Sequence, residues 1–182
     1  RENFKIYTNP KFPETVTDEE TIISIKSILE SLKDDFSGIL LDEKYSLQAY
    51  KEIGIDKSFV LPLEKSNYEL KGEEKITIQD KSPEEIRGLG AQATKILIYF
   101  DPNTELANEK SDLVKNAIEQ SHQVNLPLFF GIISEDTQNF ERVCTSVEYF
   151  LKKSIIPDVF VLEFPGSDYL CRKVSNSLGA VP

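Results

Sequence analysis

The segment Ala93-Thr94-Lys95-Ile96-Leu97-Ile98-Tyr99-Phe100-Asp101 indicates the fold class of the chain. Its apolar core is continuous rather than alternating, as in strands that are buried on both faces. Similar apolar runs occur at 38–41, 59–63, 128–133 and 159–164. Segments with helical periodicity separate most of these runs. Strands that alternate with helices predict a parallel sheet of the α/β class.

Helix boundaries in the sequence support this pattern. The segment Thr17-Asp18-Glu19-Glu20 is a capping box, and Ser82-Pro83-Glu84-Glu85 places an N-cap serine before a first-turn proline. The polar segment 67–81 is expected to be a long loop that carries at most a short strand at 75–78. Further helices are expected over 106–124, 140–153 and from Asp168 to a stop at Gly179.

The length of 182 residues is compatible with two architectures. A closed eight-unit TIM-type barrel typically takes about 250 residues and at least ~200. The chain would therefore hold an incomplete (β/α) barrel of about five to six βα units. A five-stranded open α/β sheet, in contrast, would fit the length completely. In both cases we expect a single domain over 1–182.

Composition excludes several classes of function. The net charge of −10 and the pI near 4.7 disfavour binding to nucleic acid, which depends on clustered basic residues. No apolar run approaches the ~20 residues of a membrane-spanning helix, so we expect no membrane association and a cytoplasmic location. Two cysteines and one histidine are too few for a disulfide framework or a zinc site, and we expect neither a metal nor a cofactor.

Acidic residues dominate the carboxyl ends of the predicted strands, where ligands bind in either architecture. They are Asp42, Glu64, Asp101 and Glu163. One hypothesis is a site whose carboxylates handle a polar substrate. The alternative is that acids follow strands because they cap helices and solvate turns.

Lys95 is the most distinctive candidate for chemistry. A period of two places it on one face of its strand with Leu97, Tyr99 and Asp101. A lysine buried inside a barrel loses solvation, which favours nucleophilic use. Alternatively, Lys95 lies at the exposed amino end of the strand and extends to solvent. The same parity predicts that Glu163 points inward beside it.

In order along the chain, these strands resemble strands two to six of the class I tagatose bisphosphate aldolase family, which includes sulfofructose phosphate aldolase-like members. Arg1-Glu2 resembles the end of the family's Asp-Gln-Arg segment. The resemblance rests on the segments Gly38 to Asp42, Leu63 to Lys65 with Tyr68, Ala93 to Asp101, Pro127 to Phe130 and Asp158 to Pro165.

The resemblance implies a TIM barrel that cleaves phosphorylated ketoses reversibly to dihydroxyacetone phosphate and an aldehyde, through a lysine imine and without a metal. It implies a catalytic role for Lys95, which matches an assisting lysine, and for Glu163, which matches a glutamate after the Schiff-base position. The Schiff-base lysine itself falls on Val161, and an active-site glutamate falls on Gly131. The candidate substrate-binding residues are Arg1, Asp42 and Asp101.

These departures favour a protein of aldolase ancestry that is catalytically impaired, a pseudoenzyme acting in binding or assembly. The first alternative is an active class I aldolase, a carbon–carbon lyase, with segments outside this sequence. The second is a small α/β binding or regulatory module. We expect a phosphorylated sugar or dihydroxyacetone phosphate as ligand where a site survives. An oligomer or a partner chain is expected to cover exposed strand edges.

Overall fold

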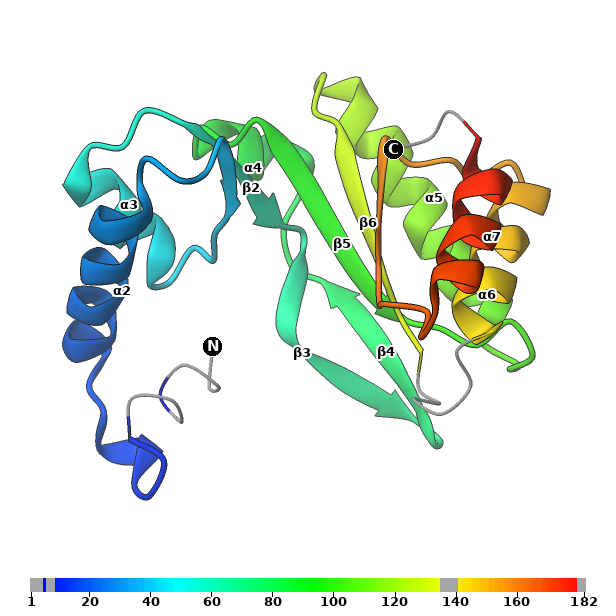
Figure 1. The fold of residues 1–182 in the computed structure, drawn as a ribbon, viewed down its shortest axis with the longest axis horizontal. Helices are drawn as coiled ribbons and strands as arrows, with labels where there is room; N and C mark the ends of the chain where they lie inside the picture. The colour runs from blue at the N-terminus through cyan, green and yellow to red at the C-terminus, as the bar shows by residue number, and fades with distance from the viewer. Residues whose placement is uncertain (1–4, 6–8, 135–140, 180–182) are drawn as a thin grey trace. The chain divides into compact units, whose positions relative to one another are not determined.

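The computed structural model describes residue 5, residues 9–134 and residues 141–179. The chain divides into two compact units, Arg1–Leu61 and Pro62–Pro182, and each is described by itself. Figure 1 labels most of the helices and strands of both. The prediction of a single domain stays a prediction. No helix among the described residues is long and apolar enough to cross a membrane.

The first unit pairs two parallel strands and packs two helices together. Ile39 lies opposite Phe59 in the strand pair. The capping box that the sequence predicts is present, because the Thr17 hydroxyl accepts from the amide of Glu20 and the Glu20 carboxylate accepts from the amide of Thr17. The elements are η1 (Pro13–Thr15), α2 (Asp18–Leu32), β1 (Gly38–Leu40), α3 (Ser46–Ile53) and β2 (Ser58–Pro62).

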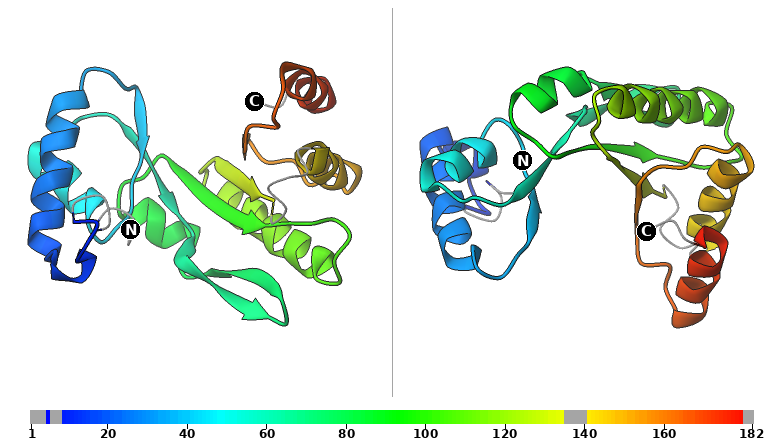
Figure 2. Two further views of the ribbon diagram at one scale, coloured as in Figure 1. Left: turned by 60° about the horizontal axis from the view of Figure 1, so that its bottom comes forward. Right: turned by 90° about the horizontal axis from the view of Figure 1, so that it is seen from above.

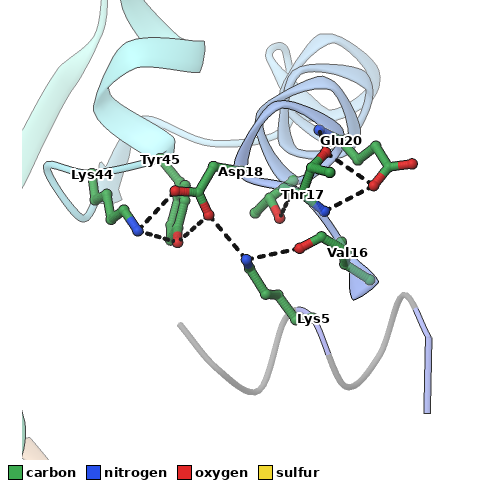
Figure 3. Close-up of polar contacts among 8 residues, drawn as sticks. Lys5, Val16, Thr17, Asp18, Glu20, Lys44 and Tyr45 are labelled. Atoms are coloured by element: carbon green, nitrogen blue, oxygen red, sulfur yellow. Dashed lines mark hydrogen bonds and ion pairs between the residues drawn. The ribbon is translucent and has the colours of Figure 1, made fainter. Parts of the chain in front are cut away.

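A polar network ties the start of α2 to the loop after β1 (Figure 3). The Asp18 carboxylate accepts hydrogen bonds from Lys5 and from the Tyr45 hydroxyl, and forms an ion pair with Lys44. Hydrogen bonds from Lys44, Lys5 and Tyr45 hold the pKa of Asp18 far below its usual value of 3.8. This network positions the first turn of α2 through charges rather than through apolar packing.

The second unit consists of a three-stranded parallel sheet, an antiparallel hairpin and four helices. β6 pairs with β5 on one side and with β7 on the other. Figures 1 and 2 show α5, α6 and α7 on one side of these strands. The elements are β3 (Glu64–Lys71), β4 (Glu74–Gln79), α4 (Pro83–Gly88), β5 (Ala93–Tyr99), α5 (Ala107–Gln123), β6 (Leu128–Ile133), α6 (Glu141–Lys152), β7 (Val159–Leu162) and α7 (Asp168–Leu178).

Aromatic packing identifies the helix-facing side of this sheet. Phe150 of α6 contacts both Phe100 and Phe130, with ring centroids 4.7 and 4.8 Å apart. Phe130 also contacts Phe160 of β7. Because side chains alternate along a strand, the residues between these positions point to the opposite side, which we call the inward face. The helix-facing side chains are almost fully buried, whereas Val161 on the inward face is 42% exposed.

The sequence predictions hold for most elements and fail in one segment. The five predicted strands are present within one or two residues of the expected limits, as are the predicted capping box at Thr17 and the predicted N-cap at Ser82, which is also a capping box. In the segment 67–81 the short strand expected at 75–78 is present within β4, but the long loop is replaced by a hairpin of β3 and β4 with a turn at Gly72, whose φ is +66°. The helix α3 was not predicted at all.

Candidate functional site

The centre of the inward face is an apolar row that crosses three strands. Leu97 of β5 lies opposite Gly131 of β6, which in turn lies opposite Val161 of β7. A Cβ atom added at Gly131 would lie only 3.1 Å from Cδ1 of Leu97. The Leu97 side chain therefore fills the space beside Gly131, and this central row contains neither an amine nor a carboxylate.

Lys95 lies one step along the same face and is held in an ion pair. Its Nζ atom is 2.6 Å from Oε1 of Glu64 at the start of β3, and the two side chains are only 12% and 11% exposed. The backbone brings them together, since the amide of Leu63 donates to the carbonyl of Lys95. The alternative of a solvent-exposed Lys95 is therefore wrong, and its partner is Glu64.

The burial of Glu64 has an electrostatic consequence. Desolvation raises the pKa of the Glu64 carboxyl above its usual 4.5, and the positive charge of Lys95 opposes that rise. Oxygen Oε2 of Glu64 is buried and accepts no hydrogen bond of ordinary geometry from the residues that the structure describes. Burial of a carboxylate with one oxygen unsatisfied is unfavourable, so the attraction of Lys95 is needed to keep this charge inside.

Asp101 and Glu163, two other acids at the carboxyl ends of the unit 2 strands, are bound by the chain itself, whereas Glu135 lies outside the described residues. Asp101 accepts a hydrogen bond from the amide of Asn103 through Oδ1 and forms an ion pair with Arg142 of α6 through Oδ2. Glu163 accepts a hydrogen bond of 2.7 Å from the amide of Ser134. Each contact gives its carboxylate a structural role. Such roles agree with the alternative that acids follow the strands because they cap helices and solvate turns.

Asp42 in the first unit has a comparable task. Its two oxygens accept from the amides of Tyr45 and Ser46, and the second oxygen also accepts from the Ser46 hydroxyl at 2.7 Å. These contacts hold the first turn of α3. Arg1, the remaining candidate, lies outside the described residues. Substrate binding by Asp42, Asp101 and Arg1, and catalysis by Lys95 and Glu163, stay predictions.

An aromatic cluster at the β3–β4 hairpin was missed by the sequence analysis. The rings of Tyr68 and Tyr99 meet edge to face at 5.1 Å, and Nζ of Lys75 lies 5.0 and 4.6 Å from their centroids. The Thr77 hydroxyl donates to the carbonyl of Leu97 at 2.7 Å. Tyr68 was part of the quoted resemblance, but the sequence gives no signal that the hairpin lies against β5.

Within the described ranges, no group of three or more His, Cys, Asp or Glu side chains could hold a metal ion. The polar groups that the structure brings together near the inward face are the paired Lys95 and Glu64 and the tyrosines near the hairpin.

No protein-family model matches the chain. Individual relatives do match. The tagatose 1,6-diphosphate aldolase 2 of Enterococcus faecalis is 27% identical over 137 residues, which cover 73% of this chain and 41% of that protein. The tagatose 1,6-diphosphate aldolase of Streptococcus pneumoniae is 27% identical over 143 residues, covering 73% and 43%. The chain thus spans less than half the length of these relatives.

Solved structures extend the comparison to the whole fold. An archaeal fructose 1,6-bisphosphate aldolase superposes with a TM-score of 0.68 at 18% sequence identity, covering 98% of this chain and 66% of that one. A fructose-bisphosphate aldolase from Plasmodium falciparum superposes with a TM-score of 0.60 at 12% identity, covering 91% and 60%. These matches identify the partial TIM-type barrel, rather than the open sheet, as the architecture. The chain is an aldolase-like partial α/β barrel with distant, partial sequence similarity to the tagatose 1,6-bisphosphate aldolases.

Proposed function

We propose that this partial barrel forms no imine with ketose phosphates and acts in binding or assembly. The observation that carries the proposal is the central row of Leu97, Gly131 and Val161. Imine chemistry requires an amine fixed inside the barrel. By resemblance to the tagatose bisphosphate aldolases, the positions of Val161 and Gly131 are those of the Schiff-base lysine and of an active-site glutamate.

The surviving polar groups agree with this proposal. Lys95 is bound to Glu64, and an ammonium in an ion pair is a poor nucleophile because its lone pair carries a proton. Asp101 and Glu163 are bound to Arg142 and to the Ser134 amide. The candidate ligand is dihydroxyacetone phosphate or a phosphorylated sugar, a cytosolic metabolite that would be held without being cleaved. A cofactor is not part of the proposal.

The first alternative is an active class I aldolase whose missing groups lie outside this sequence. It is favoured by the coverage of the relatives, since a longer native protein could supply a lysine and a phosphate site. An intact mass of the native gene product, compared with the 20.7 kDa of this chain, separates the two cases. The second alternative is a small α/β binding or regulatory module for another ligand.

Assembly is the second part of the proposal. β7 pairs with β6, and its other side makes no strand pair among the described residues. Val161 on this strand and Phe164 just after it are 42% and 68% exposed. Proteins usually cover such edges and apolar side chains with another segment or chain. We therefore expect an oligomer or a stable partner, and a monodisperse monomer in a sizing experiment would argue against it.

A cleavage assay tests the proposal. Release of triose phosphate from tagatose 1,6-bisphosphate is measured for the native protein and for the variants Lys95→Ala and Val161→Ala. We expect the same background rate for all three. Cleavage by the native protein that Lys95→Ala abolishes and Val161→Ala retains would show an active aldolase. Calorimetric titration with dihydroxyacetone phosphate then measures binding separately from cleavage.

A further inference from the structure

We propose that Glu64 holds Lys95 as an unreactive ammonium, so that the inward face carries a latent amine for small carbonyl compounds. The inference rests on the proposed function, because an amine can be called latent only where the native chain forms no imine. The ion pair is then a second reason, besides the central row, why the native chain would form no imine. The central row lacks an amine, and Glu64 keeps the remaining inward-facing amine of β5 from reacting.

The geometry of the ion pair carries this inference. Nζ of Lys95 and Oε1 of Glu64 are 2.6 Å apart. The two side chains are only 12% and 11% exposed. Water screens a covered pair much less than an exposed one. The carboxylate therefore holds the Nζ atom of Lys95 in a close ion pair that water hardly weakens, and the amine is not free to meet a carbonyl compound.

Several neighbours of Lys95 on the inward face are themselves partly exposed, so a small reagent has only partly buried side chains to pass. The strand neighbours of Lys95 on that face, Leu97 and Tyr99, are partly exposed. Phe129 lies opposite Lys95 across the β5–β6 pair and is also partly exposed. The lysine is thus covered mainly by its ion-pair partner and by apolar side chains, an environment in which a neutral amine is well tolerated.

The reaction that becomes possible is imine formation. The lone pair of the neutral Lys95 amine attacks the carbonyl carbon of an aldehyde, and a carbon–nitrogen bond forms. The carbonyl oxygen takes up one proton from the nitrogen and one from solvent and leaves as water, so that the product is a protonated imine. Cyanoborohydride then delivers a hydride to the imine carbon, and the product is a stable secondary amine on Lys95.

The test compares the native protein with the variant Glu64→Gln, which keeps the shape of the side chain and removes its charge. Each protein is incubated with glycolaldehyde and cyanoborohydride between pH 7 and pH 9, and labelled lysines are quantified by peptide mass spectrometry. Lys152, whose side chain is 78% exposed, is the internal reference. Glu74→Gln is the matched control, because Glu74 pairs with the buried Lys110 of α5 instead.

We expect the ratio of Lys95 to Lys152 labelling at pH 7.5 to rise at least about tenfold in Glu64→Gln, which corresponds to ~1.4 kcal/mol of lost ammonium stabilisation. The ratio should stay at the native value in Glu74→Gln.

An unchanged ratio in folded Glu64→Gln would overturn the inference and leave the proposed function intact. Labelling of Lys95 as rapid as that of Lys152 in the native protein would contradict both. Where circular dichroism shows that Glu64→Gln does not fold, Glu64→Asp replaces it, since it keeps the charge and withdraws it by one methylene. An intermediate rise is expected for that variant, and no rise would again overturn the inference.

Discussion

The side chain of Leu97 occupies the space next to Gly131 that a larger residue would need. A Cβ atom at Gly131 would lie 3.1, 3.3 and 3.4 Å from Cδ1, Cγ and Cβ of Leu97. The two residues are register partners in the β5–β6 pair. The glycine at position 131 and the leucine at position 97 are thus one structural feature.

Restoring a glutamate at position 131 should therefore be unfavourable unless Leu97 is also changed. Gly131→Glu is expected to lower the free energy of unfolding by about 1–3 kcal/mol, through overpacking and burial of a carboxylate. In a Leu97→Ala background the same change should cost less. Urea unfolding of the four proteins of this double-mutant cycle measures the coupling. Additive effects would contradict the packing that we describe.

The raised pKa of Glu64 predicts the sign of a pH effect on stability. The folded protein keeps a proton on Glu64 at pH values where the unfolded chain has already released it. The free energy of unfolding of the native protein should therefore fall, relative to that of Glu64→Gln, as the pH rises above about 4.5. Urea unfolding of both proteins from pH 4 to pH 8 checks this slope, and a difference that grows in the opposite direction would be inconsistent with it.

Asp18 should show the opposite behaviour. Its contacts with Lys44, Lys5 and Tyr45 depress its pKa, so the stability that they contribute is present above the unfolded pKa of 3.8 and is lost as the pH falls below it. Asp18→Asn should lack this acid-dependent loss. Thermal unfolding of both proteins at pH 5 and pH 2.5 compares them. If Asp18→Asn loses as much stability between pH 5 and pH 2.5 as the native protein, the acid-dependent loss comes from other carboxylates.

Asp158 joins the amino ends of β6 and β7 and should matter for stability. One of its oxygens accepts from the Leu128 amide and contacts Nε2 of His122, each at 2.8 Å. Asp158→Ala leaves the amide of the buried Leu128 without this acceptor, and the expected loss is about 1–3 kcal/mol. His122→Ala is the control and should change the stability by less than ~1 kcal/mol, because that pair is exposed. If chemical unfolding shows a larger loss of stability for His122→Ala than for Asp158→Ala, the histidine contact contributes more than the amide contact.

The sequence predicts the local features of this fold well. The capping boxes at Thr17 and Ser82 are recognisable because all their hydrogen bonds join residues three positions apart. The strands of the parallel sheet are recognisable because their sequences are continuously apolar, as in strands buried on both faces, although Val161 on the inward face is 42% exposed. The β3–β4 hairpin has a polar sequence, and its β3 strand is largely exposed. The pattern that marks the other strands is therefore missing there.

The site is predictable only in part. Strand parity correctly places Lys95 on the same face as Leu97, because the alternation of side chains is a local property. The partner of Lys95 is not predictable in this way, since Glu64 lies 31 positions away and reaches it only through the tertiary structure. The parity argument also expected Glu163 beside Lys95, but the residue of β7 that is level with Lys95, through Phe129, is Val159, four positions before Glu163.

Trapping of an imine in the native protein tests the central claim most directly. The protein is incubated with dihydroxyacetone phosphate, reduced with borohydride and analysed by peptide mass spectrometry. Because the central row of Leu97, Gly131 and Val161 carries no amine and Lys95 is paired with Glu64, we predict no adduct on the inward face. A stoichiometric adduct on Lys95 would contradict the account.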